Sequence, residues 1–271
     1  MKKKKIDKYN VIVGKVSELK KNDIVYLTSD IMPLVLNFRK QKENFDPNKF
    51  IDAIIKKIGP NGTLLLPSFN WDFCKGKKYN YLYSPPQTGS LPSIVFKRKD
   101  FKRTKHPIYS FLVWGKDKEF LYNLKNKSGW GYKSPFWYFH KFKAKQLFIG
   151  LNYKNGFTFM HYPEEKVGSQ YRFLKNFSST YIDENGKEKI SSYQMHVKDL
   201  NKGVDCYVDP RLDDILIKKK AYFRYKINDT YISLVDLGIA GNILEKELKL
   251  KRNFLIYTKE IAKLNDKILK N

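Results

Sequence analysis

Residues 46–67 of this 271-residue chain read DPNKFIDAIIKKIGPNGTLLLP, and this stretch decides the fold class. Asp46 and Pro47 suit the cap and the first position of a helix, and Gly59 and Pro60 suit its end. Between them, apolar residues recur at the spacing of one helical face, namely Phe50, Ile51, Ile54, Ile55 and Ile58. Residues 63–67 follow as a short apolar run, which is typical of a buried strand.

The segments on either side extend this alternation. Residues 23–28 form a second expected buried strand, and a helix joins it to 63–67, so the two strands should pair in parallel through a right-handed crossover. Further strands and helices are expected at 109–114 and 146–151, and at 116–124 and 134–141. Two antiparallel hairpins follow, 171–181 with 189–196 and 222–227 with 230–235. We therefore expect an α/β fold with a central, mainly parallel sheet flanked by helices, an additional antiparallel β part in the C-terminal half, and a single domain over residues 1–271.

The composition indicates a globular cytoplasmic protein. Hydrophobic residues make up 42% and charged residues 30%, which suits a packed core. The formal net charge of +26 attracts anions, but charge alone does not define a nucleic-acid binder. The basic N-terminus lacks the apolar stretch of a signal peptide, and no run approaches the roughly 20 apolar residues of a membrane span. Cys74 and Cys206 form no CxxC pair and no zinc-type cluster, so neither a disulfide nor a metal site is expected.

The histidines are the first candidates for acid–base chemistry. His161 and Glu164 are three residues apart, which places them on one face if the segment is helical. A carboxylate beside an imidazole fixes its tautomer and raises its basicity, although the same spacing also occurs on solvated helix faces. His140 lies in an aromatic-rich helix and is interpreted as a packing residue, whereas His196 ends a hairpin strand and is expected to be exposed.

Several segments, taken in order, resemble the aminoglycoside 3-N-acetyltransferases and their sugar-modifying relatives. The matching segments are 24–30, 46–71, 84–92, the Arg-x-x-His-Pro-x-x-Ser motif at 103–110 and the Thr-x-x-His-x-x-Glu motif at 158–164. The resemblance covers about residues 20–170. Leu27 departs from the pattern, because many members have His there, and Asp209 is the best candidate for the family's later acidic residue.

The resemblance implies an acyl-CoA-dependent N-acyltransferase with acetyl-CoA or another acyl-CoA as cosubstrate and no metal. His161 is then the general base and Glu164 orients it. The residues implied for the acyl-CoA are Thr28, Ser29, Arg103, Lys105, His106, Ser110 and Thr158. The residues implied for the acceptor are Trp71, Asp72 and Asp209.

The acceptor is expected to be the amine of a small amino sugar. Because a polycationic antibiotic is repelled by a net charge of +26, we expect a nucleotide-linked amino sugar, as used in surface-glycan or lipopolysaccharide biosynthesis. One alternative is an aminoglycoside antibiotic 3-N-acetyltransferase. A second is a non-catalytic protein that binds nucleic acid or an anionic surface and stacks bases on Trp71, Tyr79, Tyr81 and Tyr83. We expect no nucleic-acid partner for the enzyme, and a homodimer is compatible with the sequence.

Overall fold

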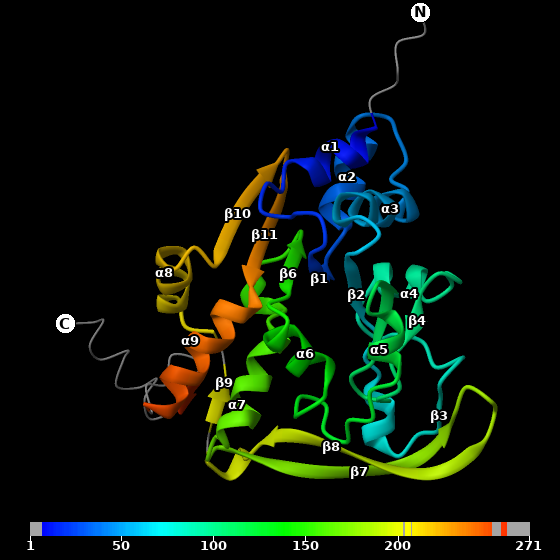
Figure 1. Cartoon of the computed structure of the whole chain (residues 1–271), viewed down its shortest axis with the longest axis vertical. Helices are drawn as coiled ribbons and strands as arrows, with labels where there is room; N and C mark the ends of the chain where they lie inside the picture. Colours follow the sequence, from blue (N-terminus) through cyan, green and yellow to red (C-terminus); the bar gives the residue numbers. More distant parts are fainter. Residues whose placement is uncertain (1–6, 203, 207, 251–255, 259–271) are drawn as a thin grey trace, which may run out of the picture.

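The structure is a computed structural model that describes residues 7–202, 204–206, 208–250 and 256–258. Its main element is a seven-stranded sheet with the strand order β10-β11-β6-β1-β2-β5-β4 (Figure 1). These strands are β1 (Ile24–Ser29), β2 (Thr63–Pro67), β4 (Lys102–Arg103), β5 (Phe111–Gly115), β6 (Lys145–Ile149), β10 (Tyr222–Ile227) and β11 (Thr230–Asp236). Among the described residues no helix is long and apolar enough to cross a membrane.

Helices cover both faces of this sheet, so the molecule has three layers. Alternate residues of β1 enter two separate cores, with Tyr26 in one and Val25 and Leu27 in the other. The core around Val25 is closed by α1 (Lys8–Gly14), α2 (Met32–Lys40), α3 (Pro47–Ile58) and α4 (Ser90–Val95). The core around Tyr26 is closed by α5 (Lys118–Tyr122), α6 (Pro135–Lys141), α7 (His161–Val167), α8 (Arg211–Lys218) and α9 (Leu237–Lys249).

The stretch that decides the fold forms as expected. The Asp46 side chain accepts the backbone N–H groups of Asn48 and Lys49 at the start of α3, and Gly59 ends the helix with φ +72°. The strands β1 and β2 pair in parallel, with Ile24 opposite Thr63, so the predicted crossover unit is confirmed.

The parallel part of the sheet is limited to β6, β1 and β2. The strand predicted at 109–114 is present as β5, but it runs antiparallel to β2. The reason is that the direction of a strand depends on which end of the sheet its connection enters, and the residues of the strand do not carry that information. The strands at the other edge, β11 and β10, are also antiparallel, as the expected C-terminal hairpin requires.

The carboxyl ends of the three parallel strands meet at one edge. The Asp30 N–H donates to the Ile149 carbonyl at 2.8 Å, so the chain segments that leave β1 and β6 lie together. Gly150 has φ +71°, and a Cβ there would collide with the Asp30 carbonyl. This close approach leaves the side chains beyond β1 and β6 on one rim of the sheet.

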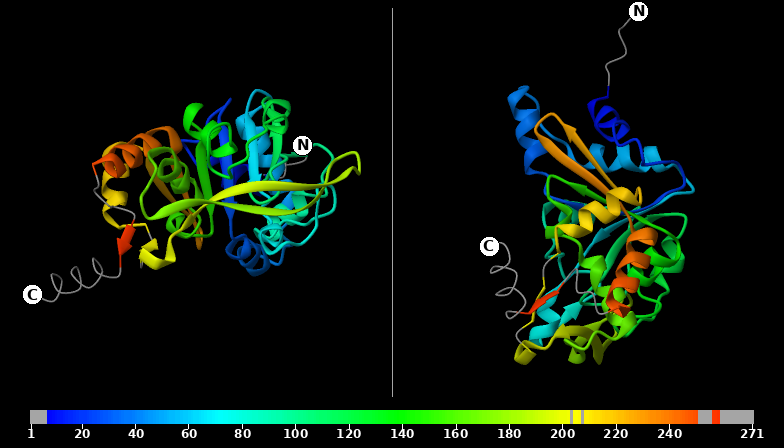
Figure 2. Two further views of the ribbon diagram at one scale, coloured as in Figure 1. Left: turned by 90° about the horizontal axis from the view of Figure 1, so that it is seen from below. Right: turned by 90° about the vertical axis from the view of Figure 1, so that its left-hand side faces the viewer.

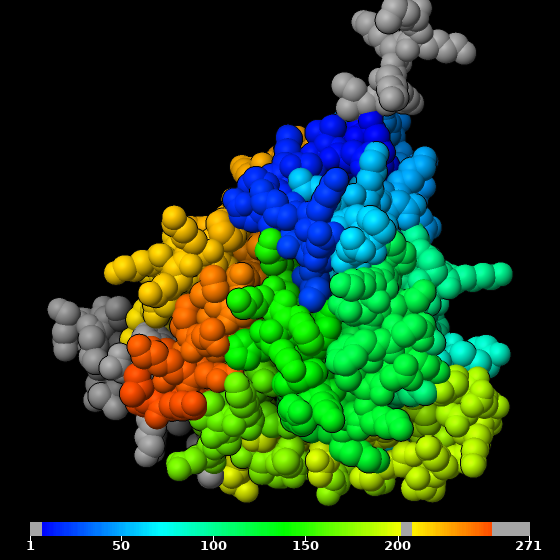
Figure 3. Space-filling model, in the orientation of Figure 1, coloured from blue at the N-terminus to red at the C-terminus, as the bar shows by residue number. Residues whose placement is uncertain are grey.

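The hairpin predicted at 171–181 and 189–196 folds as a separate sheet beneath the seven-stranded one. It consists of β7 (Arg172–Ile182) and β8 (Glu188–Lys198), and β3 (Tyr79–Asn80) pairs with β7. The hairpin runs as a long ribbon along the lower side of the molecule in Figure 1 and crosses beneath the sheet when seen from below in Figure 2. In the space-filling view it forms the lower rim of that face (Figure 3). A short antiparallel pair joins β9 (Val204–Cys206) to β12 (Ile256–Thr258).

Candidate active site

The predicted histidine and carboxylate meet at the start of α7. A 3-10 turn over Thr158–Met160 leads into this helix, and His161 is its first residue. His161 Nδ1 lies 2.7 Å from Glu164 Oε2, one turn further along the helix. The His161 side chain is 21% exposed, whereas that of Glu164 is 0% exposed. The imidazole therefore reaches solvent while its carboxylate partner is fully buried.

The carboxylate of Glu164 is held ionised by its neighbours. The Tyr171 hydroxyl donates to Oε1 at 3.1 Å, and Arg172 Nε lies 2.8 Å from Oε2. Burial acts to raise the pKa of Glu164. The charge that His161 carries when protonated, its hydrogen bond, and then the charge of Arg172 outweigh burial and leave this pKa below its usual value.

An ionised carboxylate only accepts hydrogen bonds, and this fixes the histidine tautomer. Because Oε2 of Glu164 lies 2.7 Å from His161 Nδ1, this nitrogen must carry the proton and donate. The other ring nitrogen, Nε2, then has a free lone pair. This is the form in which an imidazole can act as a general base.

A row of aromatic rings leads to the imidazole. The Trp130 ring lies 4.5 Å from the His161 ring, the Tyr109 ring lies 4.7 Å from that of Trp130, and the Phe69 ring lies 4.7 Å from that of Tyr109. Trp71, predicted to bind the acceptor, follows Phe69 at 6.2 Å and is half-exposed. The row therefore links the surface at Trp71 to the histidine.

The hairpin supplies two residues that sequence reasoning did not include in the site. Arg172 is the first residue of β7 and contacts Glu164, and its Nη1 donates to the His196 carbonyl at 3.0 Å. The prediction that His196 is exposed is wrong, because its side chain is buried where the hairpin folds against the site. Burial, and then the charge of Arg172, lower the pKa of His196 to about 4, so its ring is neutral at neutral pH. Alternating strand residues give no local signal for the side on which a hairpin folds.

Two residues implied for the acyl-CoA, Thr28 and Thr158, lie close together near the start of α7. Thr28 and Thr158 both lie beside the hydroxyl of the buried Tyr26, where burial raises its pKa and the two threonine hydroxyls act to lower it. Thr28 Oγ1 also accepts a hydrogen bond from Gln146 Nε2 at 3.0 Å. Ser29 follows at the end of β1. Thr28 and Thr158 therefore lie on the face of the sheet that carries Tyr26, whereas Ser29, the next residue of β1, lies on the face of Val25 and Leu27.

Arg103 and Ser110 have a structural role instead. Arg103 is 4% exposed, and its Nε donates to Ser110 Oγ at 2.9 Å. Its Nη2 and Nη1 donate to the carbonyls of Ser68 at 2.9 Å and Ser84 at 2.5 Å. The guanidinium therefore ties three chain segments together from inside the fold. The burial of both side chains argues against the prediction that Arg103 and Ser110 bind the acyl-CoA.

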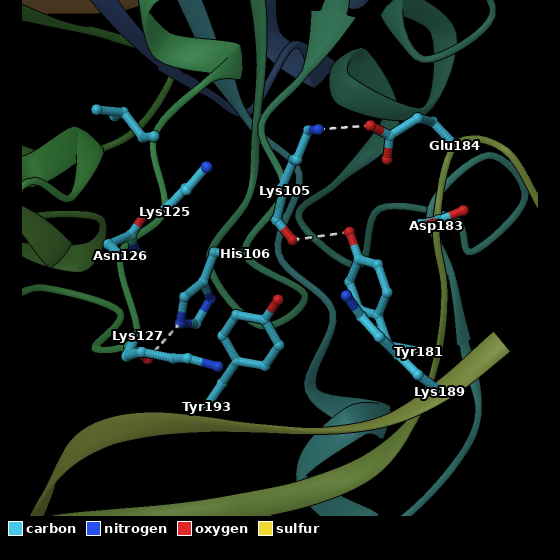
Figure 4. A pocket seen from close by; sticks show the side chains of 11 residues that line it. Lys105, His106, Lys125, Asn126, Lys127, Tyr181, Asp183, Glu184, Lys189 and Tyr193 are labelled. Atoms are coloured by element: carbon cyan, nitrogen blue, oxygen red, sulfur yellow. Dashed lines mark hydrogen bonds and ion pairs between the residues drawn. The ribbon is translucent and has the colours of Figure 1, made fainter. Parts of the chain in front are cut away.

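Lys105 and His106 line a cavity of about 360 Å³ that lies between residues 124–127 and the hairpin (Figure 4). His106 is buried, with Nδ1 accepting the Tyr109 N–H at 3.0 Å. Burial lowers the pKa of His106 to about 3, so the ring is a neutral packing group. Lys105 pairs with Glu184. His161 is not among the residues that line this cavity.

The two remaining acceptor candidates are carboxylates with cationic partners. Asp72 lies 3.4 Å from Lys77 Nζ on the segment after Trp71. Asp209 is buried and accepts two hydrogen bonds from the Arg211 guanidinium, at 3.0 and 2.8 Å, just before α8. Within the described residues, no three His, Cys, Asp or Glu side chains come together as a metal site.

Fold and site together define an α/β protein with a histidine–glutamate pair beside the carboxyl edge of its parallel strands. The family model described as aminoglycoside 3-N-acetyltransferase matches residues 40–246, and the chain belongs to this family. The predicted family and the α/β fold are therefore confirmed. The expectation of a single domain over 1–271 and the choice of site residues stay predictions.

Individual relatives agree with this assignment. The chain is 26% identical over 143 residues to the SPbeta prophage-derived aminoglycoside N(3')-acetyltransferase-like protein YokD of Bacillus subtilis (strain 168), which covers 44% of this chain and 52% of the relative. It thus spans about half the length of this curated relative. The crystal structure of aminoglycoside acetyltransferase AAC(3)-Xa matches with a TM-score of 0.74 at 15% identity, over 92% of this chain and 93% of the other. A structure described as AAC-IIIb binary with CoASH matches with a TM-score of 0.69 at 15% identity, over 90% and 95%.

Proposed function

We propose that this protein is an acyl-CoA-dependent N-acyltransferase in which His161 removes the proton from the acceptor amine. The observation that carries the proposal is the 2.7 Å contact between His161 Nδ1 and the buried Glu164, in a chain of an N-acetyltransferase family. Glu164 holds the proton on Nδ1. It also stabilises the imidazolium that forms once Nε2 has accepted the proton of the amine.

The acyl donor is assigned to Thr28 and Ser29 at the end of β1 and to Thr158 in the turn before α7. Hydroxyl groups are neutral hydrogen-bond donors and acceptors, which suit the amide and carbonyl groups of an acyl-CoA better than they suit a metal ion. When bound, the acyl-CoA supplies an activated thioester carbonyl. The amine nitrogen forms the new C–N bond as its proton passes to His161 Nε2, the C–S bond breaks, and the sulfur leaves as a thiol after taking up a proton.

The first candidate acceptor is an aminoglycoside. The family description and the printed name of the YokD relative support this alternative more than they support a nucleotide-linked sugar. Another similar structure is described as sisomicin-bound AAC-VIa, with a TM-score of 0.71 and 18% identity over 90% of this chain and 98% of the other. A nucleotide-linked amino sugar remains the second candidate because the net charge is +26.

The test is acyl transfer by the purified full chain. Acetyl-CoA is offered with a panel of aminoglycosides and nucleotide amino sugars, thiol release is followed optically, and the acetylated product is identified by mass spectrometry. His161→Ala is expected to lower turnover by about two to four orders of magnitude, the usual contribution of a positioned acid–base group.

His140→Ala is the matched control. His140 Nε2 lies 2.9 Å from Asn242 Oδ1 on α9, so this substitution removes the same ring from a packing position. Turnover per folded molecule should stay near that of the parent chain. Near-normal turnover by a folded His161→Ala variant would remove His161 as the base. Failure to acylate any acceptor on the panel would contradict the activity.

A further inference from the structure

Arg172 makes contacts with both members of the His161–Glu164 pair. Its side chain is 3% exposed, and Nε lies 2.8 Å from Glu164 Oε2. Its Nη2 lies 3.2 Å from His161 Nδ1, and its Nη1 donates to the His196 carbonyl. A guanidinium is therefore buried against the same ring nitrogen that the carboxylate engages.

The two charged partners act on the imidazole in opposite directions. A buried carboxylate beside Nδ1 favours the imidazolium form, and a buried cation at 3.2 Å disfavours it. Glu164 and Arg172 cannot both form a hydrogen bond with Nδ1 at the same time. The carboxylate needs a proton on Nδ1, whereas the guanidinium needs the lone pair of that nitrogen. The carboxylate contact is shorter, at 2.7 Å, so Arg172 acts on the ring through its charge.

We propose that Arg172 is a positioning residue that keeps His161 neutral and ready to accept a proton on Nε2 near neutral pH. This inference rests on the proposed function of His161 as the base. Arg172 balances the charge of Glu164, so the carboxylate can hold the ring by its Nδ1 proton without keeping it permanently protonated.

The other titratable groups around the pair do not provide this balance. The Tyr171 hydroxyl donates to Glu164, and burial followed by the Glu164 charge raises the pKa of Tyr171, so it stays neutral. Burial and the charge of Arg172 lower the pKa of His196, so that ring is neutral as well. Glu165, the next residue on α7, accepts a hydrogen bond from Ser128 at 2.7 Å on the loop that carries Trp130.

The competing role for Arg172 is that of a structural link. Its contacts join α7 to both strands of the hairpin, so its removal could reduce stability without changing the histidine. The two roles differ in the protonation of His161, which can be measured without any substrate.

The experiment is an NMR titration of histidine-labelled full-length protein, together with the pH profile of kcat/KM. In Arg172→Met the buried carboxylate loses its balancing charge, so the midpoint of the His161 imidazole titration should rise by about one pH unit or more. The acid limb of kcat/KM should move up by the same amount, so activity lost at pH 7 returns at higher pH. Arg172→Lys keeps a charge and should restore much of the parent midpoint.

A double variant covers the case in which Arg172→Met does not fold. Glu164→Gln/Arg172→Met removes both buried charges, and the midpoint of its His161 titration should lie above that of Glu164→Gln, which still carries the buried guanidinium. The proposal would be overturned by an unchanged midpoint in folded Arg172→Met, or by a double variant whose midpoint equals that of Glu164→Gln. With lower thermal stability as the only change, Arg172 would be a structural link. If the midpoint shifts as expected but the parent chain acylates nothing, the proposed function fails and the role of Arg172 stands.

Discussion

Glu164→Gln is the sharpest test of the site, because it changes a charge and almost no volume. The carboxylate accepts from Tyr171 on one oxygen and contacts His161 and Arg172 on the other. A glutamine has one oxygen and one NH2 group. We expect the oxygen to face His161 and Arg172, since both are donors there, and the NH2 group to donate to the Tyr171 oxygen. The Nδ1–H tautomer then survives, and the main change is the lost negative charge.

The size of the effect follows from that charge. Two unit charges about 4 Å apart attract by about 4 kcal/mol at an effective dielectric constant of about 20. If the developing imidazolium loses most of this attraction, turnover should fall by about two to three orders of magnitude, at 1.36 kcal/mol per tenfold change. Leaving Arg172 buried without an anionic partner should also cost about 3–5 kcal/mol of the free energy of unfolding.

The assay combines kcat over a range of pH with chemical denaturation. The acid limb of the Glu164→Gln profile should move to lower pH, opposite to the shift expected for Arg172→Met, because the remaining guanidinium disfavours the imidazolium. Glu165→Gln is the matched control, since its carboxylate accepts from Ser128 and the substitution is the same one residue along. A folded Glu164→Gln variant with unchanged kcat at every pH would refute the assignment of Glu164 as the partner of the base.

Two further predictions concern residues that were assigned to the acyl-CoA from sequence. Arg103→Met should lower the free energy of unfolding by about 3–5 kcal/mol, because it strands the carbonyls of Ser68 and Ser84 inside the fold; a raised KM for acetyl-CoA with unchanged urea denaturation would instead restore the phosphate role. His106 has its pKa lowered to about 3 by burial, so its contribution to stability is complete above about pH 6.5, the usual histidine value, and is lost as pH falls toward 3. Between pH 6.5 and pH 5 the free energy of unfolding of the parent chain, measured by denaturant titration, should therefore fall by about 2 kcal/mol more than that of His106→Gln. Equal decreases in the two proteins would contradict a buried neutral ring.

Local signals in the sequence were sufficient to predict the helices and strands, but not the direction in which each strand runs in the sheet. The cap at Asp46 and the stop at Gly59 act within a few residues, so α3 and the strand after it could be predicted from those residues alone. The antiparallel direction of β5 depends on the path of the chain between residues 68 and 110, which no local spacing encodes.

In the site, too, some contacts could be predicted from local spacing and others depend on how the whole chain folds. His161 and Glu164 are one helical turn apart, so their contact could be predicted from spacing. Arg172 and His196 reach the pair only because Gly168, in the left-handed conformation with φ +72°, ends α7 and allows the hairpin to turn back beneath it. The burial of Arg103 could not be predicted for a related reason. The sequence shows that a motif contains an arginine, but not whether its side chain contacts a ligand or is buried inside the fold.

The charges at the site also show why net charge is a weak guide to the acceptor. A surplus of +26 spread over the surface is screened within about 8–10 Å at ordinary salt concentrations, whereas buried charges are screened much less. Glu164 and the two carboxylates predicted for the acceptor are each engaged by a cation of the same chain, Glu164 by Arg172, Asp72 by Lys77 and Asp209 by Arg211. An approaching amine therefore meets a local field set by these pairs and by the half-exposed ring of Trp71, and not by the total charge. The repulsion that favoured a nucleotide-linked sugar acts at long range and on the encounter rate, so it does not exclude an aminoglycoside once that molecule is within reach of His161.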